Sequence, residues 1–172
     1  MRRIAIVVPA LIVGIFALVL VGGAIAKRPA HSATPVFKLN LKPSQEVPPI
    51  KGLKADARGS VTFDLERPAS GAITSGEVIF YFNYSFKGSV NITGLHIHQA
   101  AKGVNGGIVV SSNLAPFTDV DGQGNITTVV TGTPPATLQA ILDNPRNYYV
   151  NLHTSVNAGG AMREQMHNPK NR

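Results

Sequence analysis

A run of alternating apolar and polar residues at positions 77–86 constrains the fold of this chain more than any other feature. Its apolar members fall on one face of an extended strand: Val78, Phe80, Phe82, Tyr84 and Phe86. Aromatic and β-branched side chains with a period of two are typical of a strand that packs one face into a core. The run therefore predicts a core β-strand and favours a fold built mainly from sheets.

Similar but shorter patterns recur along the chain. They predict further strands at about residues 36–42, 58–65, 90–99, 108–111, 125–131, 146–154 and 161–166. Residues 134–142 predict one short helix, because Pro suits a first helical turn and Leu138, Ile141 and Leu142 share a face. About eight strands at this spacing predict a mainly β protein, an antiparallel β-sandwich with one short helix.

Asp and Gly dominate residues 119–124, between two of the predicted strands. Calcium binding is the tempting interpretation, but an EF-hand loop needs further oxygen ligands and a closing bidentate Glu, which the sequence lacks. We therefore expect a plain hairpin turn in this segment.

The N-terminus is set apart by an uncharged run at residues 4–26, which follows Arg2 and Arg3. As a helix, a run of this length would reach across the roughly 30 Å of a bilayer core. Small residues up to Ala26 also fit a signal-peptidase site, so residues 1–26 are either a cleaved signal peptide or a membrane anchor. The two arginines favour a cytoplasmic N-terminus, which predicts an extracytoplasmic domain, membrane-anchored or secreted.

The remaining residues predict a tether at 27–35, a single β domain at 36–167 and a tail at 168–172. The formal charge is +7, but the basic residues are scattered over separate segments. Nucleic-acid binders instead concentrate such residues on one element, so no nucleic-acid partner is expected. Cell-envelope proteins or polymers are the expected partners, together with the membrane itself through residues 4–26 if they are not cleaved.

The chain contains no cysteine, which excludes disulfides, thiol nucleophiles and cysteine-ligated metal sites. It also lacks the Gly-x-Ser-x-Gly elbow of a serine hydrolase and a phosphate-binding loop. We therefore expect a protein that is not an enzyme, and any bound metal must be held by His and carboxylate groups.

Histidine spacing is the strongest chemical signal. His96 and His98 lie two residues apart on a predicted strand, so both imidazoles leave the same face about 6.5 to 7 Å apart at the backbone. The alternation also places Ile92 on this face. His153 comes from another predicted strand, and neutral imidazole is a common ligand for copper and zinc. These three histidines are the candidate ligands of one copper or zinc ion.

Glu46 and Arg163 complete the candidate site. Glu46 could be a fourth ligand or accept a hydrogen bond from an imidazole N–H. It could instead form a semi-buried ion pair with Arg163, and the proline-rich context of Glu46 favours an inward-pointing side chain. The alternative to metal binding is a structural role, in which the histidines form a hydrogen-bonded polar cluster and Glu46 and Arg163 pair.

Five segments, in order, resemble the chordin domain family, usually written CHRD. They are QEVPP at 45–49, LHIH at 95–98, GVNGGIVV at 103–110, YYVNLHT at 148–154 and NAGGAMREQ at 157–165. The last departs from the family pattern at Ala161, where Glu is usual. The resemblance covers about residues 37–166 and implies an exported, single-domain microbial type with a β-sandwich-like fold and no settled biochemical activity.

The function must therefore be inferred from the residues. The leading hypothesis is an extracytoplasmic, non-enzymatic CHRD-like module that binds a partner or has a structural role. The alternative is mononuclear copper or zinc binding through His96, His98 and His153, for metal handling or, less favoured, redox chemistry.

Overall fold

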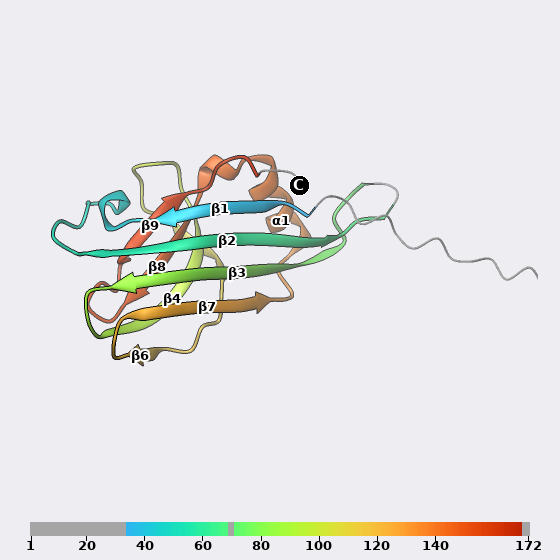
Figure 1. Ribbon diagram of the computed structural model, residues 1–172. Coiled ribbons are helices and arrows are strands. Elements are labelled where there is room, and N and C mark those ends of the chain that lie inside the picture. Colours follow the sequence, from blue (N-terminus) through green and yellow to red (C-terminus); the bar gives the residue numbers. More distant parts are fainter. Residues whose placement is uncertain (1–33, 69–70, 170–172) are drawn as a thin grey trace, which may run out of the picture.

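The computed structural model of the protein describes residues 34–68 and 71–169 (Figure 1). The predicted signal or anchor segment, residues 1–26, lies outside these ranges, as do most of the predicted tether and the end of the tail. Within the described part of the chain, no helix is long and apolar enough to cross a membrane.

The described residues form two antiparallel sheets (Figure 1). The first has the strand order β1-β2-β3-β7 and contains β1 (Val36–Leu41), β2 (Ala55–Glu66), β3 (Ser75–Phe86) and β7 (Gln123–Val130). The second has the order β5-β4-β8-β9 and contains β4 (Val90–Gln99), β5 (Gly107–Ser111), β8 (Tyr148–Thr154) and β9 (Met162–Gln165), with β6 (Phe117–Asp119) paired to the start of β4. The described residues also form one α-helix, α1 (Pro135–Asp143), and two 3-10 turns, η1 (Pro43–Gln45) and η2 (Pro145–Asn147). The prediction of a mainly β, antiparallel fold with one short helix is confirmed.

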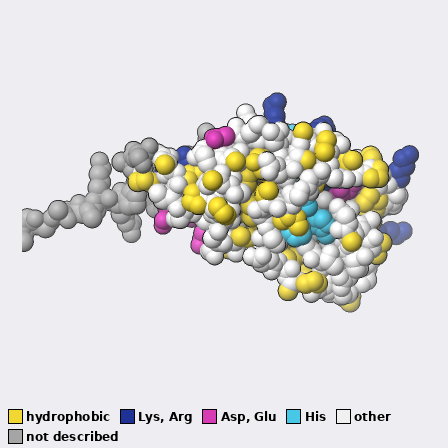
Figure 2. Space-filling model, turned by 180° about the vertical axis from the view of Figure 1, so that it is seen from behind, with side chains coloured by type: hydrophobic (Ala, Val, Ile, Leu, Met, Phe, Trp, Pro, Cys, Tyr) yellow, Lys and Arg dark blue, Asp and Glu magenta, His cyan; other side chains and the backbone are white. Residues whose placement is uncertain are grey.

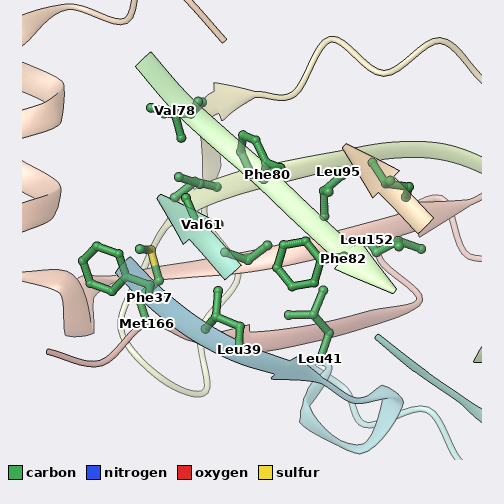
Figure 3. Close-up of a cluster of buried hydrophobic side chains, with 14 of the residues drawn as sticks. Phe37, Leu39, Leu41, Val61, Val78, Phe80, Phe82, Leu95, Leu152 and Met166 are labelled. Atoms are coloured by element: carbon green, nitrogen blue, oxygen red, sulfur yellow. The ribbon is translucent and has the colours of Figure 1, made fainter. Parts of the chain in front are cut away.

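The core lies between the two sheets. Figure 3 shows Phe80 and Phe82 of β3 among side chains from β1 and β2, with Leu95 of β4 and Leu152 of β8 on the other side. The alternating face predicted for β3 is buried along its whole length. Burying an aliphatic or aromatic side chain of this size contributes about 1.5 to 3 kcal/mol, which explains why this strand is central.

The edge strand β1 of the first sheet meets the edge strand β9 of the second sheet at the end of β1. Lys42 and Arg163 form an isolated antiparallel bridge, in which the Lys42 N–H donates to the Arg163 carbonyl at 3.2 Å and the Arg163 N–H donates back at 3.3 Å. This bridge holds η1 and the following loop against β9. Glu46 lies in that loop, so the bridge brings it close to the second sheet.

The strand count differs from the prediction because β6 has only three residues, of which Phe117 alone is a large apolar residue. Such a segment is too short to show a period of two. The hairpin predicted at residues 119–124 is also wrong, since β6 pairs in the second sheet and β7 in the first. The turn between them crosses from one sheet to the other, and Asp119 holds it by accepting hydrogen bonds from the backbone N–H groups of Asp121 and Gly122.

A β-bulge in β4 corrects another prediction. Ile92 pairs with Thr154 of β8, but the next pair joins Gly94 to His153, so Thr93 is an extra residue. The bulge turns Ile92 onto the core face, where it is fully buried, rather than onto the face of the histidines. Local alternation cannot show this, because a bulge reverses the pattern from one residue to the next.

Candidate metal centre

Three histidines meet on the outer face of the second sheet. In the neighbouring strands β4 and β8, Leu95, Ile97, Val150 and Leu152 point into the core, so His96, His98 and His153 point to the opposite face. One ring nitrogen of each histidine lies within 4.8 Å of those of the other two. These three residues are called the histidine cluster below. Figure 2 shows histidine side chains gathered at the surface on this side of the molecule.

Burial differs among the members of the cluster. His98 and His153 are only 6% and 7% exposed, whereas His96 is partly exposed. Burial is the main cause that lowers the pKa of all three imidazoles, and it lowers the pKa of His96 to about 4. The cluster is therefore neutral at pH 7, which is the protonation state that binds a metal ion.

Backbone carbonyls determine which ring nitrogens carry hydrogen. The Nδ1 atom of His98 lies 3.0 Å from the Gly106 carbonyl oxygen, and Nδ1 of His153 lies 3.0 Å from that of Ala158. A carbonyl oxygen can only accept, so both Nδ1 atoms must donate. In a neutral ring the Nε2 atom is then an unprotonated acceptor, as it is in most metal-binding histidines.

The two Nε2 atoms of His98 and His153 lie 3.3 Å apart. Neither has a hydrogen to donate to the other in this tautomer, so two lone pairs face each other at short range. A proton between them would create a buried imidazolium, which the lowered pKa values disfavour. A metal ion would satisfy both lone pairs, and the ring nitrogens of the cluster therefore fit copper or zinc.

Gly94 makes room for the third ring. A Cβ atom at this position would lie 2.7 Å from Cε1 and 3.0 Å from Nε2 of His96. Because Gly94 has no side chain, the His96 ring can lie over it and come within 4.8 Å of the His153 ring centroid. The Nδ1 atom of His96 is buried without a hydrogen-bond partner. Sequence reasoning missed Gly94, whose role depends on its pairing with His153 across the sheet.

Tyr149 supports His98 in two ways. Its ring stacks on the His98 imidazole, with the centroids 4.9 Å apart and the planes at 10°. Its hydroxyl oxygen accepts the Gly106 N–H at 3.2 Å, which holds the residue whose carbonyl binds His98. The Arg163 guanidinium lies over the Tyr149 ring, 4.5 Å from the centroid. Tyr149 pairs with His98 across the sheet, and a contact that depends on strand pairing could not be predicted from the sequence.

Arg163 and Glu46 face each other beside the cluster. Arg163 Nε lies 3.9 Å from Glu46 Oε2, and both side chains are buried, at 4% and 5% exposure. The shorter contacts of Arg163 are to neutral acceptors: it donates to the Gln45 carbonyl at 2.7 Å and to Asn105 Oδ1 at 2.8 Å. Glu46 does not belong to the set of residues whose ligand atoms lie within 4.8 Å of one another. The geometry therefore gives Glu46 a guanidinium partner rather than a position among the three imidazoles.

The Glu46 carboxyl is poorly satisfied. Burial raises its pKa to about 7, while the Arg163 charge and a hydrogen bond from the Val47 backbone oppose the rise. Its Oε1 atom has no hydrogen-bond partner, and neither has Oδ1 of the buried Asn151. Both oxygens border Gly160, where a Cβ atom would lie 2.8 Å from Glu46 Oε1, 2.7 Å from Asn151 Oδ1 and 2.3 Å from Asn151 Nδ2. Only glycine fits at this position.

The sequence and structure of the domain were compared with those of known proteins. Neither the comparison with curated proteins nor that with solved structures finds a match. A family model described as CHRD domain matches residues 37–166. This range runs from β1 to the residue after β9 and includes the histidine cluster, Glu46 and Arg163. The chain belongs to the CHRD domain family.

Proposed function

We propose that this CHRD domain is an extracytoplasmic, non-enzymatic module that binds one copper or zinc ion. The ligands are the Nε2 atoms of His98 and His153 and a ring nitrogen of His96. The observation that carries the proposal is that the Nε2 atoms of His98 and His153 lie 3.3 Å apart, while the Nδ1 atom of each ring donates to a backbone carbonyl oxygen. An arrangement of neutral acceptors without a donor is costly unless a cation lies between them.

The surroundings of the cluster suit metal handling. Two of the three rings are held by backbone carbonyls and one of these is also stacked on Tyr149, so the ligands need little rearrangement on binding. His96 is partly exposed, which gives an ion a path to the cluster from solvent. Three protein ligands leave a coordination position open.

Metal titration tests the proposal. The purified full-length protein, stripped with a chelator, is titrated with Zn(II) and with Cu(II) in a calorimeter. We expect one equivalent to bind, and the double variant His96→Ala, His98→Ala to lose this binding. The control His167→Ala changes an exposed histidine beyond β9 and should bind as the parent does. The proposal is wrong if the double variant, shown by circular dichroism to be folded, binds with unchanged affinity.

The extracytoplasmic location is supported by the sequence of residues 1–26, with its two arginines and long uncharged run. Membrane-impermeant protease applied to intact cells should digest the domain, or the domain should be found in the medium. Protection of the domain until the cells are lysed would contradict this location.

A second candidate function, binding of an anionic cell-envelope polymer, is favoured by a surface cleft. This cleft has a volume of about 540 Å³ and lies between the β1–β2 connection, the β3–β4 turn and the end of β8. Its lining includes Lys54 and Lys87 but no carboxylate. The double variant Lys54→Gln, Lys87→Gln should bind an anionic polysaccharide such as alginate less tightly, and equal binding by the parent and the variant would exclude the cleft as the site.

A further inference from the structure

The ligand set of the histidine cluster carries no negative charge. Among the described residues, the group of potential ligand atoms consists of three imidazoles and includes neither Asp nor Glu. An imidazole binds a metal ion in its neutral form, so the three ligands bring no negative charge to the ion. A bound ion would therefore keep its full formal charge in a partly buried site.

The buried carboxylate beside the cluster does not compensate an added charge. Glu46 faces Arg163, which is itself buried and positively charged, so an ionised Glu46 is already balanced. Arg163 also lies over Tyr149, whose ring stacks on His98. Arg163 and His98 therefore contact the same aromatic ring, and the field of the guanidinium opposes a second positive charge at the cluster.

The charge of the ion then decides which metal is favoured. The cost of transferring an ion from water to a protein interior grows with the square of its charge, so a dication costs about four times as much as a monocation of similar size. With three protein ligands, Zn(II) also needs a water molecule to complete its four-coordinate set. Cu(I), a closed-shell monocation, is stable with three imidazole nitrogens and requires neither a carboxylate nor a fourth ligand.

Resting on the metal binding proposed above, we infer that the histidine cluster selects copper in its +1 state over Zn(II). Copper that reaches the site as Cu(II) is reduced by one electron from an external reductant such as ascorbate, which is oxidised in turn. No bond of the protein is formed or broken. The same charge argument predicts that the site stabilises Cu(I) against oxidation, and so raises the reduction potential of bound copper above that of the aqueous ion.

Competition measurements test this selectivity. The full-length protein competes with bicinchoninate for Cu(I) under ascorbate and, separately, with a chromophoric chelator for Zn(II). The dissociation constant for Cu(I) should be at least about 100-fold smaller than that for Zn(II). A dissociation constant for Zn(II) equal to or smaller than that for Cu(I) would overturn the selectivity while leaving the metal site intact. Absence of binding by either metal would instead refute the proposed function.

An isosteric charge change gives a second test. Asn151 pairs with His96 across the sheet and precedes His153 by two residues, so it lies on the same strand face as the cluster. Asp and Asn have nearly the same shape, so Asn151→Asp adds a carboxylate to this face with little change in packing. This variant should tighten Zn(II) binding at least tenfold and Cu(I) binding much less. The control Asn83→Asp places the same charge on an exposed position of the other sheet and should change neither. Equal tightening of both metals by Asn151→Asp would contradict the charge argument.

Discussion

Replacement of Glu46 by Gln should change how the stability of the domain depends on pH. The folded protein raises the pKa of this carboxyl from 4.5 to about 7, mainly through burial. A raised pKa means that the folded state binds the proton more tightly than the unfolded state. The carboxyl therefore contributes its full stability below pH 4.5, and this contribution is lost as the pH rises through about 7.

The size of the effect follows from the same two pKa values. At about 1.4 kcal/mol for each pKa unit, a rise from 4.5 to about 7 corresponds to about 3 to 4 kcal/mol. Gln cannot ionise and has nearly the shape of the protonated acid, so Glu46→Gln removes this loss. Arg163 is not left without partners in the variant, because its N–H groups donate to Gln45, Val104 and Asn105. We therefore expect the variant to be the more stable protein at pH 8 and similar to the parent at pH 4.5.

Urea denaturation followed by circular dichroism between pH 4.5 and pH 8, in metal-free protein, measures this difference. Titration of the histidines affects parent and variant alike and cancels in the comparison. The control Glu77→Gln changes an exposed carboxyl of β3 and should follow the parent at every pH. Parallel stability curves for the parent and Glu46→Gln, with no divergence above pH 6, would refute the argument from burial.

Three further outcomes are expected. Gly160→Ala should lower the free energy of unfolding by about 2 kcal/mol or more, because the φ of this residue is +133° and the added Cβ would lie 2.3 Å from Asn151 Nδ2. The control Gly159→Ala adds a Cβ in open space and should cost little. Phe63→Ala should cost about 3 to 5 kcal/mol in the same denaturation assay because the ring is fully buried, and Val129→Ala, at a 53% exposed position, much less. Burial lowers the pKa values of the histidine cluster and so moves proton competition to lower pH. The affinity for Zn(II), measured by calorimetry, should therefore fall between pH 7.5 and pH 6 by less than about 14-fold, the loss that two imidazoles of ordinary pKa would cause. Three imidazoles with ordinary pKa values would lose about 50-fold over this interval.

Much of the fold could be predicted because its strands carry strong local patterns. The alternation in β3 and the Pro-initiated helix α1 are examples in which burial follows from the spacing of apolar residues. The three-residue strand β6 and the bulge at Thr93 carry no such pattern, since both depend on pairing with a neighbouring strand. The crossing turn at residues 119–124 could not be distinguished from a hairpin for the same reason.

Part of the candidate site could likewise be predicted from local strand geometry, whereas the rest depends on contacts between distant segments. The spacing of His96 and His98 predicts that both rings leave one face, and this depends only on strand geometry. The contacts that hold the rings come from distant backbone groups, the carbonyls of Gly106 and Ala158, which have no side-chain signature in the sequence. The part played by Gly94 depends on what lies across the sheet, and a glycine in a strand does not show this by itself.

Nitrogen NMR of the histidine rings tests the central claim most directly. In metal-free protein at pH 7, the rings of His98 and His153 should both show a protonated Nδ1 and an unprotonated Nε2. One equivalent of Zn(II) or Cu(I), both diamagnetic, should shift one ring nitrogen each of His96, His98 and His153 together, saturate at that point, and leave exposed His167 unchanged. Rings of the cluster that keep their metal-free shifts when either metal is added would show that the three histidines form a purely structural cluster.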